Sequence, residues 1–133
     1  MQPLLNMPLT TTIAPWLSVR GSRLALDFYK SAFNATEAYL LDGGEKGIVA
    51  RLSIDGAEFW ISDESPEHGN PGPETAGGVS VRMILTVDDP DTVFTQAISA
   101  GATQIYPVTE GHGWRVGRVM DPFGHHWEIG RPL

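Results

Sequence analysis

Cysteine is absent from this 133-residue sequence, and so is any long apolar run. Without cysteine the chain can form no disulfide, no thiolate nucleophile and no cysteine-ligated zinc site. No apolar stretch approaches the roughly 18 residues that a membrane-spanning helix needs, so we expect no membrane partner. The first 15 residues lack a basic segment followed by an apolar one, which predicts no secretory signal and a cytoplasmic location.

Basic residues are also scarce. Nine lysine and arginine residues stand against sixteen aspartate and glutamate residues, which gives a formal net charge of −7. This sign opposes the binding of phosphate backbones, so we expect no nucleic-acid partner. Cationic or neutral ligands are favoured over polyanions. The length predicts a single domain that spans residues 1–133.

An internal repeat runs through the chain at an offset of 68 residues. Residues 17–19 (Leu-Ser-Val) align with residues 85–87 (Leu-Thr-Val), and the segment 56–61 aligns with 124–129. The same offset at both ends of the unit indicates two copies of one module.

Each module is predicted to contain one strand, one helix and then three strands. Module one covers residues 12–64, where apolar residues at helical spacing follow Ser22, a candidate N-cap. Module two covers residues 79–131, where Asp89 and the proline after it mark a helix start. Residues 65–78 are rich in proline and glycine, which favours an exposed linker, with a mobile lid as the alternative.

Strand alternation separates the predicted side chains into two faces. The apolar residues Leu17, Val19 and Leu85 share one face and are expected to pack against the helices. This pattern predicts an α+β fold with cupped mixed sheets, helices on the outer face and a ligand cavity on the other face. The polar and aromatic residues expected on the cavity face include Trp16, Trp60, Arg82, His126 and Glu128.

The order of these segments resembles the vicinal oxygen chelate superfamily, which includes glyoxalases, bleomycin-resistance proteins and extradiol dioxygenases. Four stretches within residues 14–130 carry the resemblance: LDFYKSAFNATEA, LSIDGAEFWISDE, VDDPDTVFTQAISAGA and GRVMDPFGHHWEIG. The resemblance implies two βαβββ modules, a homodimer and a cavity in each cupped sheet. In many members that cavity holds a divalent metal.

The resemblance also implies which positions would hold the metal, and here they carry Ala14, Trp60, Arg82 and Glu128. Only Glu128 is of a metal-ligand type, whereas a metal needs about three or four protein ligands. We therefore expect no metal cofactor, although an ion recruited from other positions, such as His126, stays an alternative. Arg82 and Glu128 are expected to form an ion pair in place of the metal, unless both are solvated at the rim.

The expected ligand-binding residues are Trp16, Trp60, Arg82, Trp114 and Glu128. Flat rings in an acidic protein suit a planar or cationic organic molecule, through stacking and cation–π contact. With the resemblance, this predicts a metal-free small-molecule binding protein of the bleomycin-resistance type, in the class that confers antibiotic resistance by sequestration. The tryptophans could instead fill a cavity too small for a ligand.

An enzyme is the alternative function. A glyoxalase-like lyase, isomerase or dioxygenase would use a divalent metal, or would use His126 or Glu128 as its general base, and these two are the catalytic candidates. The other histidines, His68, His112 and His125, are predicted to be solvated.

Overall fold

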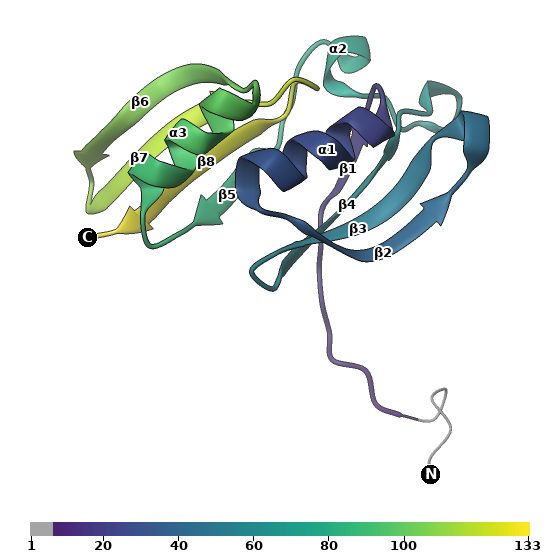
Figure 1. The fold of residues 1–133 in the computed structure, drawn as a ribbon, viewed down its shortest axis with the longest axis horizontal. Helices are drawn as coiled ribbons and strands as arrows, with labels where there is room; N and C mark the ends of the chain where they lie inside the picture. The colour runs from purple at the N-terminus through teal and green to yellow at the C-terminus, as the bar shows by residue number, and fades with distance from the viewer. Residues whose placement is uncertain (1–6) are drawn as a thin grey trace.

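The computed structural model describes residues 7–133, which form two βαβββ modules placed side by side (Figure 1). Module one contains β1 (Trp16–Val19), α1 (Ser22–Phe33), β2 (Thr36–Asp42), the 3-10 turn η2 (Gly44–Lys46), β3 (Ile48–Ile54) and β4 (Ala57–Asp63). Module two contains β5 (Met83–Thr86), α3 (Pro90–Ala100), β6 (Thr103–Gly111), β7 (Trp114–Met120) and β8 (His126–Pro132). Between them lie the 3-10 turn η3 (Pro66–His68) and the short helix α2 (Pro73–Ala76). Within residues 7–133, no helix is long and apolar enough to cross a membrane.

The two modules form two four-stranded mixed sheets, in the orders β1-β4-β3-β2 and β5-β8-β7-β6. The parallel pairs are β1 with β4 and β5 with β8. Trp16 lies opposite Trp60 in the first sheet, and Ile84 lies opposite Glu128 in the second. Both pairs obey the predicted offset, so the α+β fold with two repeated modules is confirmed.

A helix covers one face of each sheet. Helices α1 and α3 lie on the same side of the two sheets and pack against each other (Figure 1). The Gln96 amide joins them by donating to the Ser31 carbonyl at 2.8 Å and to Asn34 Oδ1 at 3.0 Å. The opposite face, which we call the uncovered face of each sheet, is open to solvent: Trp16 is 53% exposed and Ile84 is 59% exposed.

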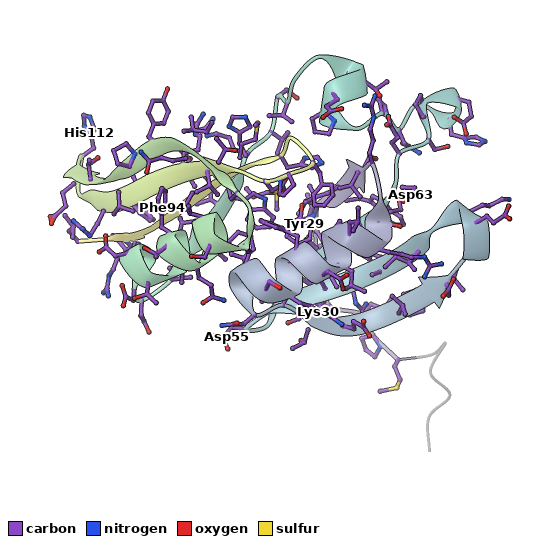
Figure 2. The ribbon with its side chains drawn as sticks, turned by 45° about the horizontal axis from the view of Figure 1, so that its top comes forward. Tyr29, Lys30, Asp55, Asp63, Phe94 and His112 are labelled. Carbon is purple, nitrogen blue, oxygen red and sulfur yellow. The ribbon has the colours of Figure 1, made fainter. Side chains whose placement is uncertain are left out.

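Tyr29 of α1 lies at the junction of the two modules (Figure 2). Its ring centroid lies 5.6 Å from that of Trp127 on β8, and its hydroxyl donates to Asp121 Oδ2 at 2.5 Å. The same oxygen accepts from the Trp127 indole at 2.9 Å. Asp121 Oδ1 accepts from the backbone N–H groups of Phe123 and His125, both at 3.0 Å. A single buried carboxylate therefore fixes the β7–β8 turn against α1.

The two long helices begin differently. Asp89 accepts from the backbone N–H of Thr92 at 3.2 Å, so it caps α3 as predicted. The N-cap of α1 is Gly21, with φ of 90°, and the prediction of Ser22 is wrong. Ser22 is the first helical residue, and its backbone N–H donates to the Asp63 carboxylate at 2.7 Å. A carboxylate on β4, distant in sequence, thus accepts a hydrogen bond from a backbone N–H group at the start of α1.

The linker is mostly exposed, and Arg20 ties it to module one. Arg20 Nε donates to Glu64 at 2.7 Å, and its terminal nitrogens donate to Glu74 at 2.5 Å and Thr75 at 2.9 Å. The second oxygen of Glu64 accepts from the Gly72 N–H at 3.2 Å. The linker is therefore a connector docked on Arg20 and Glu64.

We expect this docking to weaken in acid. Hydrogen bonds from Thr75, Arg20 and Gly72 lower the pKa of Glu64 from 4.5 to about 2. Because the pKa is lower in the folded state, the stabilisation is present above pH 4.5 and is lost as the pH falls from there through about 2. The rate at which pepsin cuts residues 65–78, divided by its rate on an unfolded substrate at the same pH, should rise as the pH falls through this range, before circular dichroism reports global unfolding. Glu64→Gln should remove this pH dependence, and a linker equally resistant at both ends of the range would refute the idea.

Candidate functional site

A row of side chains crosses all four strands on the uncovered face of each sheet. The row of module one consists of Tyr39, Arg51, Trp60 and Trp16. The row of module two consists of Tyr106, Arg118, Glu128 and Ile84. Tyrosine and arginine recur at the same places, whereas the other two places differ in chemistry.

The row of module one is aromatic. The rings of Trp16 and Trp60, which we call the aromatic stack, are 5.2 Å apart between centroids and only 6° from parallel. The Trp16 indole donates to Ser62 Oγ at 2.8 Å, which fixes the plane of its ring. Tyr39 lies 5.9 Å from Trp60, and the Arg51 guanidinium lies 5.5 Å from the same ring centroid. The stack is therefore already oriented in the free protein.

The row of module two is built around Glu128. Arg82 Nε donates to one carboxylate oxygen at 3.0 Å and Arg118 Nη2 donates to the other at 3.1 Å. The Arg118 guanidinium also lies 5.4 Å from the Tyr106 ring centroid. Burial raises the pKa of Glu128, but the two arginines outweigh that effect and leave the pKa below its ordinary value. The predicted ion pair between Arg82 and Glu128 is present, and Arg118 extends it.

A cavity of about 300 Å³ opens on the uncovered face of module two. It is lined by Ile84, Gly111, His112, Trp114, Val116, Glu128 and Gly130. His112 sits in a hairpin turn with φ of 55° and is exposed, as predicted, but its place in the cavity wall was not predicted. Figure 2 shows it at the end of module two that lies farthest from module one. His68 is also exposed, with a side chain 74% accessible.

The predicted site residues fall into two groups on separate sheets. The structure brings Arg82, Trp114 and Glu128 together on module two, and the aromatic stack lies on module one. Within residues 7–133, no hydrogen bond or ring contact links one group to the other. The metal positions implied by the resemblance, which would have to converge around one ion, are therefore divided between two half-sites on separate sheets. Ala14 is exposed and precedes β1.

The two neighbouring histidines have different environments. His126 is half-buried on β8, two residues before Glu128, and within the described chain its buried Nδ1 has no hydrogen-bond partner. His125 was predicted to be solvated, and this is wrong. Its Nε2 lies 2.9 Å from the Ser18 carbonyl oxygen, so it joins the β7–β8 turn to β1.

The residues at the metal positions do not fit a divalent ion. Across residues 7–133, no group of three or more histidine, cysteine, aspartate or glutamate side chains is arranged to hold one. Both oxygens of Glu128 already accept from guanidinium groups, whose charges repel a further cation. A carboxylate paired in this way, with a lowered pKa, is also a weak proton acceptor. The Glu128 carboxylate is therefore poorly placed to coordinate a metal ion or to abstract a proton.

Two βαβββ modules, each a four-stranded mixed sheet with a helix on one face, define a glyoxalase-like fold. The sequence profile of the Glyoxalase/Bleomycin resistance protein/Dioxygenase superfamily matches residues 13–129. The chain belongs to this superfamily.

Relatives and solved structures agree with this assignment. The uncharacterized protein Mb0911c of Mycobacterium bovis is 39% identical over 127 residues, covering 91% of this chain and 83% of that protein. The structure of the Arabidopsis thaliana gene product At5g48480 has a TM-score of 0.66 and 30% identity, covering 92% of this chain and 98% of that one. TnmS3, an antibiotic binding protein from Streptomyces sp. CB03234, has a TM-score of 0.68 and 20% identity, covering 95% and 100%. At that identity the likeness to TnmS3 shows the fold alone.

Proposed function

We propose that the protein binds a small planar organic molecule, without a metal ion and without converting it. The observation that carries this proposal is the aromatic stack, whose rings lie 6° from parallel and whose outer member, Trp16, is 53% exposed. A flat ligand can stack on such a surface without reordering it, which keeps the entropic cost of binding low. That TnmS3 binds an antibiotic on the same fold supports a binding role.

Of the two ligand types expected from sequence, the planar one is better supported than the cationic one. Arg51 already lies 5.5 Å from the centroid of Trp60 and occupies a cation–π position there. A cationic ligand would have to displace this guanidinium or approach it against charge repulsion.

We propose further that the ligand is enclosed by a homodimer. Both uncovered faces are open in the single chain, and strands β1, β2, β5 and β6 lie at sheet edges. A second copy that covers these faces would bury apolar surface and satisfy strand edges. Size-exclusion chromatography with light scattering should give twice the mass of 14.5 kDa, and a monomer at micromolar concentration would contradict this.

Native mass spectrometry with elemental analysis tests the proposed function. We expect no stoichiometric metal, and we expect tryptophan fluorescence to show saturable quenching by several planar aromatic compounds. A stoichiometric metal ion, or a fluorescence signal that ignores every such compound, would overturn the proposal.

A metal-independent enzyme is the second candidate, and the unpartnered Nδ1 of His126 is the observation that favours it. Abstraction of a proton next to a carbonyl group needs only one positioned base. Under this candidate His126→Ala abolishes turnover, whereas under the proposed binding function it leaves ligand affinity nearly unchanged. A lyase, isomerase or dioxygenase that recruits metal would lose activity to a chelator and regain it with added ion.

A further inference from the structure

The uncovered faces carry no excess of negative charge, although the protein as a whole is acidic. On the strands of module one Arg51 and Glu58 balance each other, and on module two Arg82 and Arg118 stand against Glu128. The one excess positive charge therefore lies on module two, in a chain whose net charge is −7. Other strand carboxylates bind groups of the helices or of β7, in the pairs Glu37–Lys30, Asp42–Arg23, Asp63–Ser22 and Glu110–Arg115.

Arg51 differs from the other two arginines in its hydrogen bonds. Arg82 and Arg118 each donate to Glu128. Within residues 7–133, Arg51 forms an ion pair with Glu58 but donates no side-chain hydrogen bond. The buried Nε atoms of Arg51 and Arg118 both lack a partner among the described residues, so the difference lies in their terminal nitrogens. Glu58 approaches Arg51 Nε only to 3.5 Å, and the side chain of Arg51 is 40% exposed. A guanidinium with free donors matches a carboxylate through two parallel hydrogen bonds.

The repeat shows what Arg51 is missing. In module two the residue opposite Arg118 is Glu128, which supplies a carboxylate from the neighbouring strand. In module one the residue opposite Arg51 is Trp60, which supplies only a ring face. The arginine of the tyrosine–arginine pair thus has a hydrogen-bonded carboxylate on the neighbouring strand in module two, and a ring face at that place in module one.

We infer that the ligand is a planar aromatic anion, whose ring lies against the aromatic stack and whose carboxylate or similar group accepts from Arg51. This inference rests on the proposed binding function and adds the charge of the ligand to it. The net charge of the protein predicts a preference for cationic ligands, and this inference reverses it. Exposed charges more than about 8–10 Å from the ligand are largely screened by salt, so the guanidinium that contacts the ligand has the larger effect on its affinity.

Three probes test the inference on the full chain: 2-naphthoate, 2-naphthamide and 2-naphthylmethylammonium. They share the naphthalene ring and carry a negative, a neutral and a positive substituent. The affinity of the protein for each is measured by isothermal titration calorimetry. We expect 2-naphthoate to bind about tenfold more tightly than 2-naphthamide, as a charge-assisted hydrogen-bonded pair does. Arg51→Met should abolish this preference, because it weakens 2-naphthoate far more than 2-naphthamide. Arg51→Lys should retain part of it. Arg23→Met, which removes an arginine from the helix side of the same module, is the matched control and should change nothing.

Each other result overturns the inference. If no probe binds, both the proposed function and the inference fall. If the three bind equally, or the ammonium binds best, the binding function stands and the anionic ligand is wrong. If Arg51→Met weakens 2-naphthoate and 2-naphthamide alike, Arg51 only supports the ring of Trp60. Should that variant fail to fold, Arg51→Gln gives the same comparison.

Discussion

Replacing Asp121 by alanine is expected to lower the free energy of unfolding by about 3–5 kcal/mol, the range for removing one partner of a buried charged network. Asp121 is 1% exposed and accepts from the Tyr29 hydroxyl, the Trp127 indole and two backbone N–H groups. Burial and the charge of Asp121 raise the pKa of Tyr29 well above its ordinary value, so that hydroxyl keeps its proton and remains a donor. Alanine would leave all these donors buried without an acceptor.

Chemical denaturation, monitored by circular dichroism, measures the free energy of unfolding of this variant and of two comparison variants. Tyr29→Phe removes a single hydrogen bond and should cost about 1–2 kcal/mol. Asp27→Ala removes an exposed carboxylate from α1 and should stay within about 0.5 kcal/mol of the parent. If Asp121→Ala unfolds at the same denaturant concentration as Asp27→Ala, the carboxylate does not hold the modules together.

The repeated fold was predictable because its signals are local. Strand alternation and helical spacing need only a few consecutive residues, and the offset of 68 then places the two copies in register. The pairing of Trp16 with Trp60 and of Ile84 with Glu128 is the structural counterpart of that offset. The ion pair between Arg82 and Glu128 was predicted from the metal positions that the family resemblance implies.

The contacts between modules were not predictable in this way. Tyr29 and Asp121 are 92 residues apart, and His125 and Ser18 are 107 apart. No periodic pattern connects such positions, because they meet only through the packing of one module against the other. The two half-sites were not predictable for the same reason. Whether two sheet faces share a pocket depends on how the modules are placed, and the alternation of side chains along a strand carries no information about that placement.

Arg51 left a weaker signal in the sequence. It matches Arg118, and Tyr39 matches Tyr106, at an offset of 67 where the flanking strands show 68. A loop that is one residue longer accounts for this difference. An alignment at a constant offset of 68 therefore does not pair Arg51 with Arg118 or Tyr39 with Tyr106. Strands β2 and β6 each contain a β-bulge, between Glu37 and Tyr39 and between Gln104 and Tyr106. A bulge shifts the alternation of side chains between the two faces of a sheet, so alternation alone does not assign the tyrosines to the uncovered face.

Replacing Trp60 by alanine is expected to weaken binding of a planar aromatic ligand, such as 2-naphthoate, by about a hundredfold, as buried tryptophan anchors do. Trp60 is the central ring of its row, in contact with Trp16, Tyr39 and Arg51. Its loss removes the surface that holds Trp16 parallel and the ring over which Arg51 lies. Trp60→Phe should recover part of the affinity, because a smaller ring still stacks.

The comparison needs controls for folding and for location, with affinity measured by calorimetry because the substitution removes a fluorophore. Leu24→Ala shortens an exposed side chain on the helix side, 68% accessible, and should leave affinity unchanged. Trp114→Phe alters the cavity of module two and should change affinity less than Trp60→Ala if the ring lies on module one. If Trp114→Phe abolishes binding and Trp60→Ala does not, the ligand binds on module two. A hundredfold loss confined to Trp60 would instead mark the aromatic stack as the place where the ligand lies.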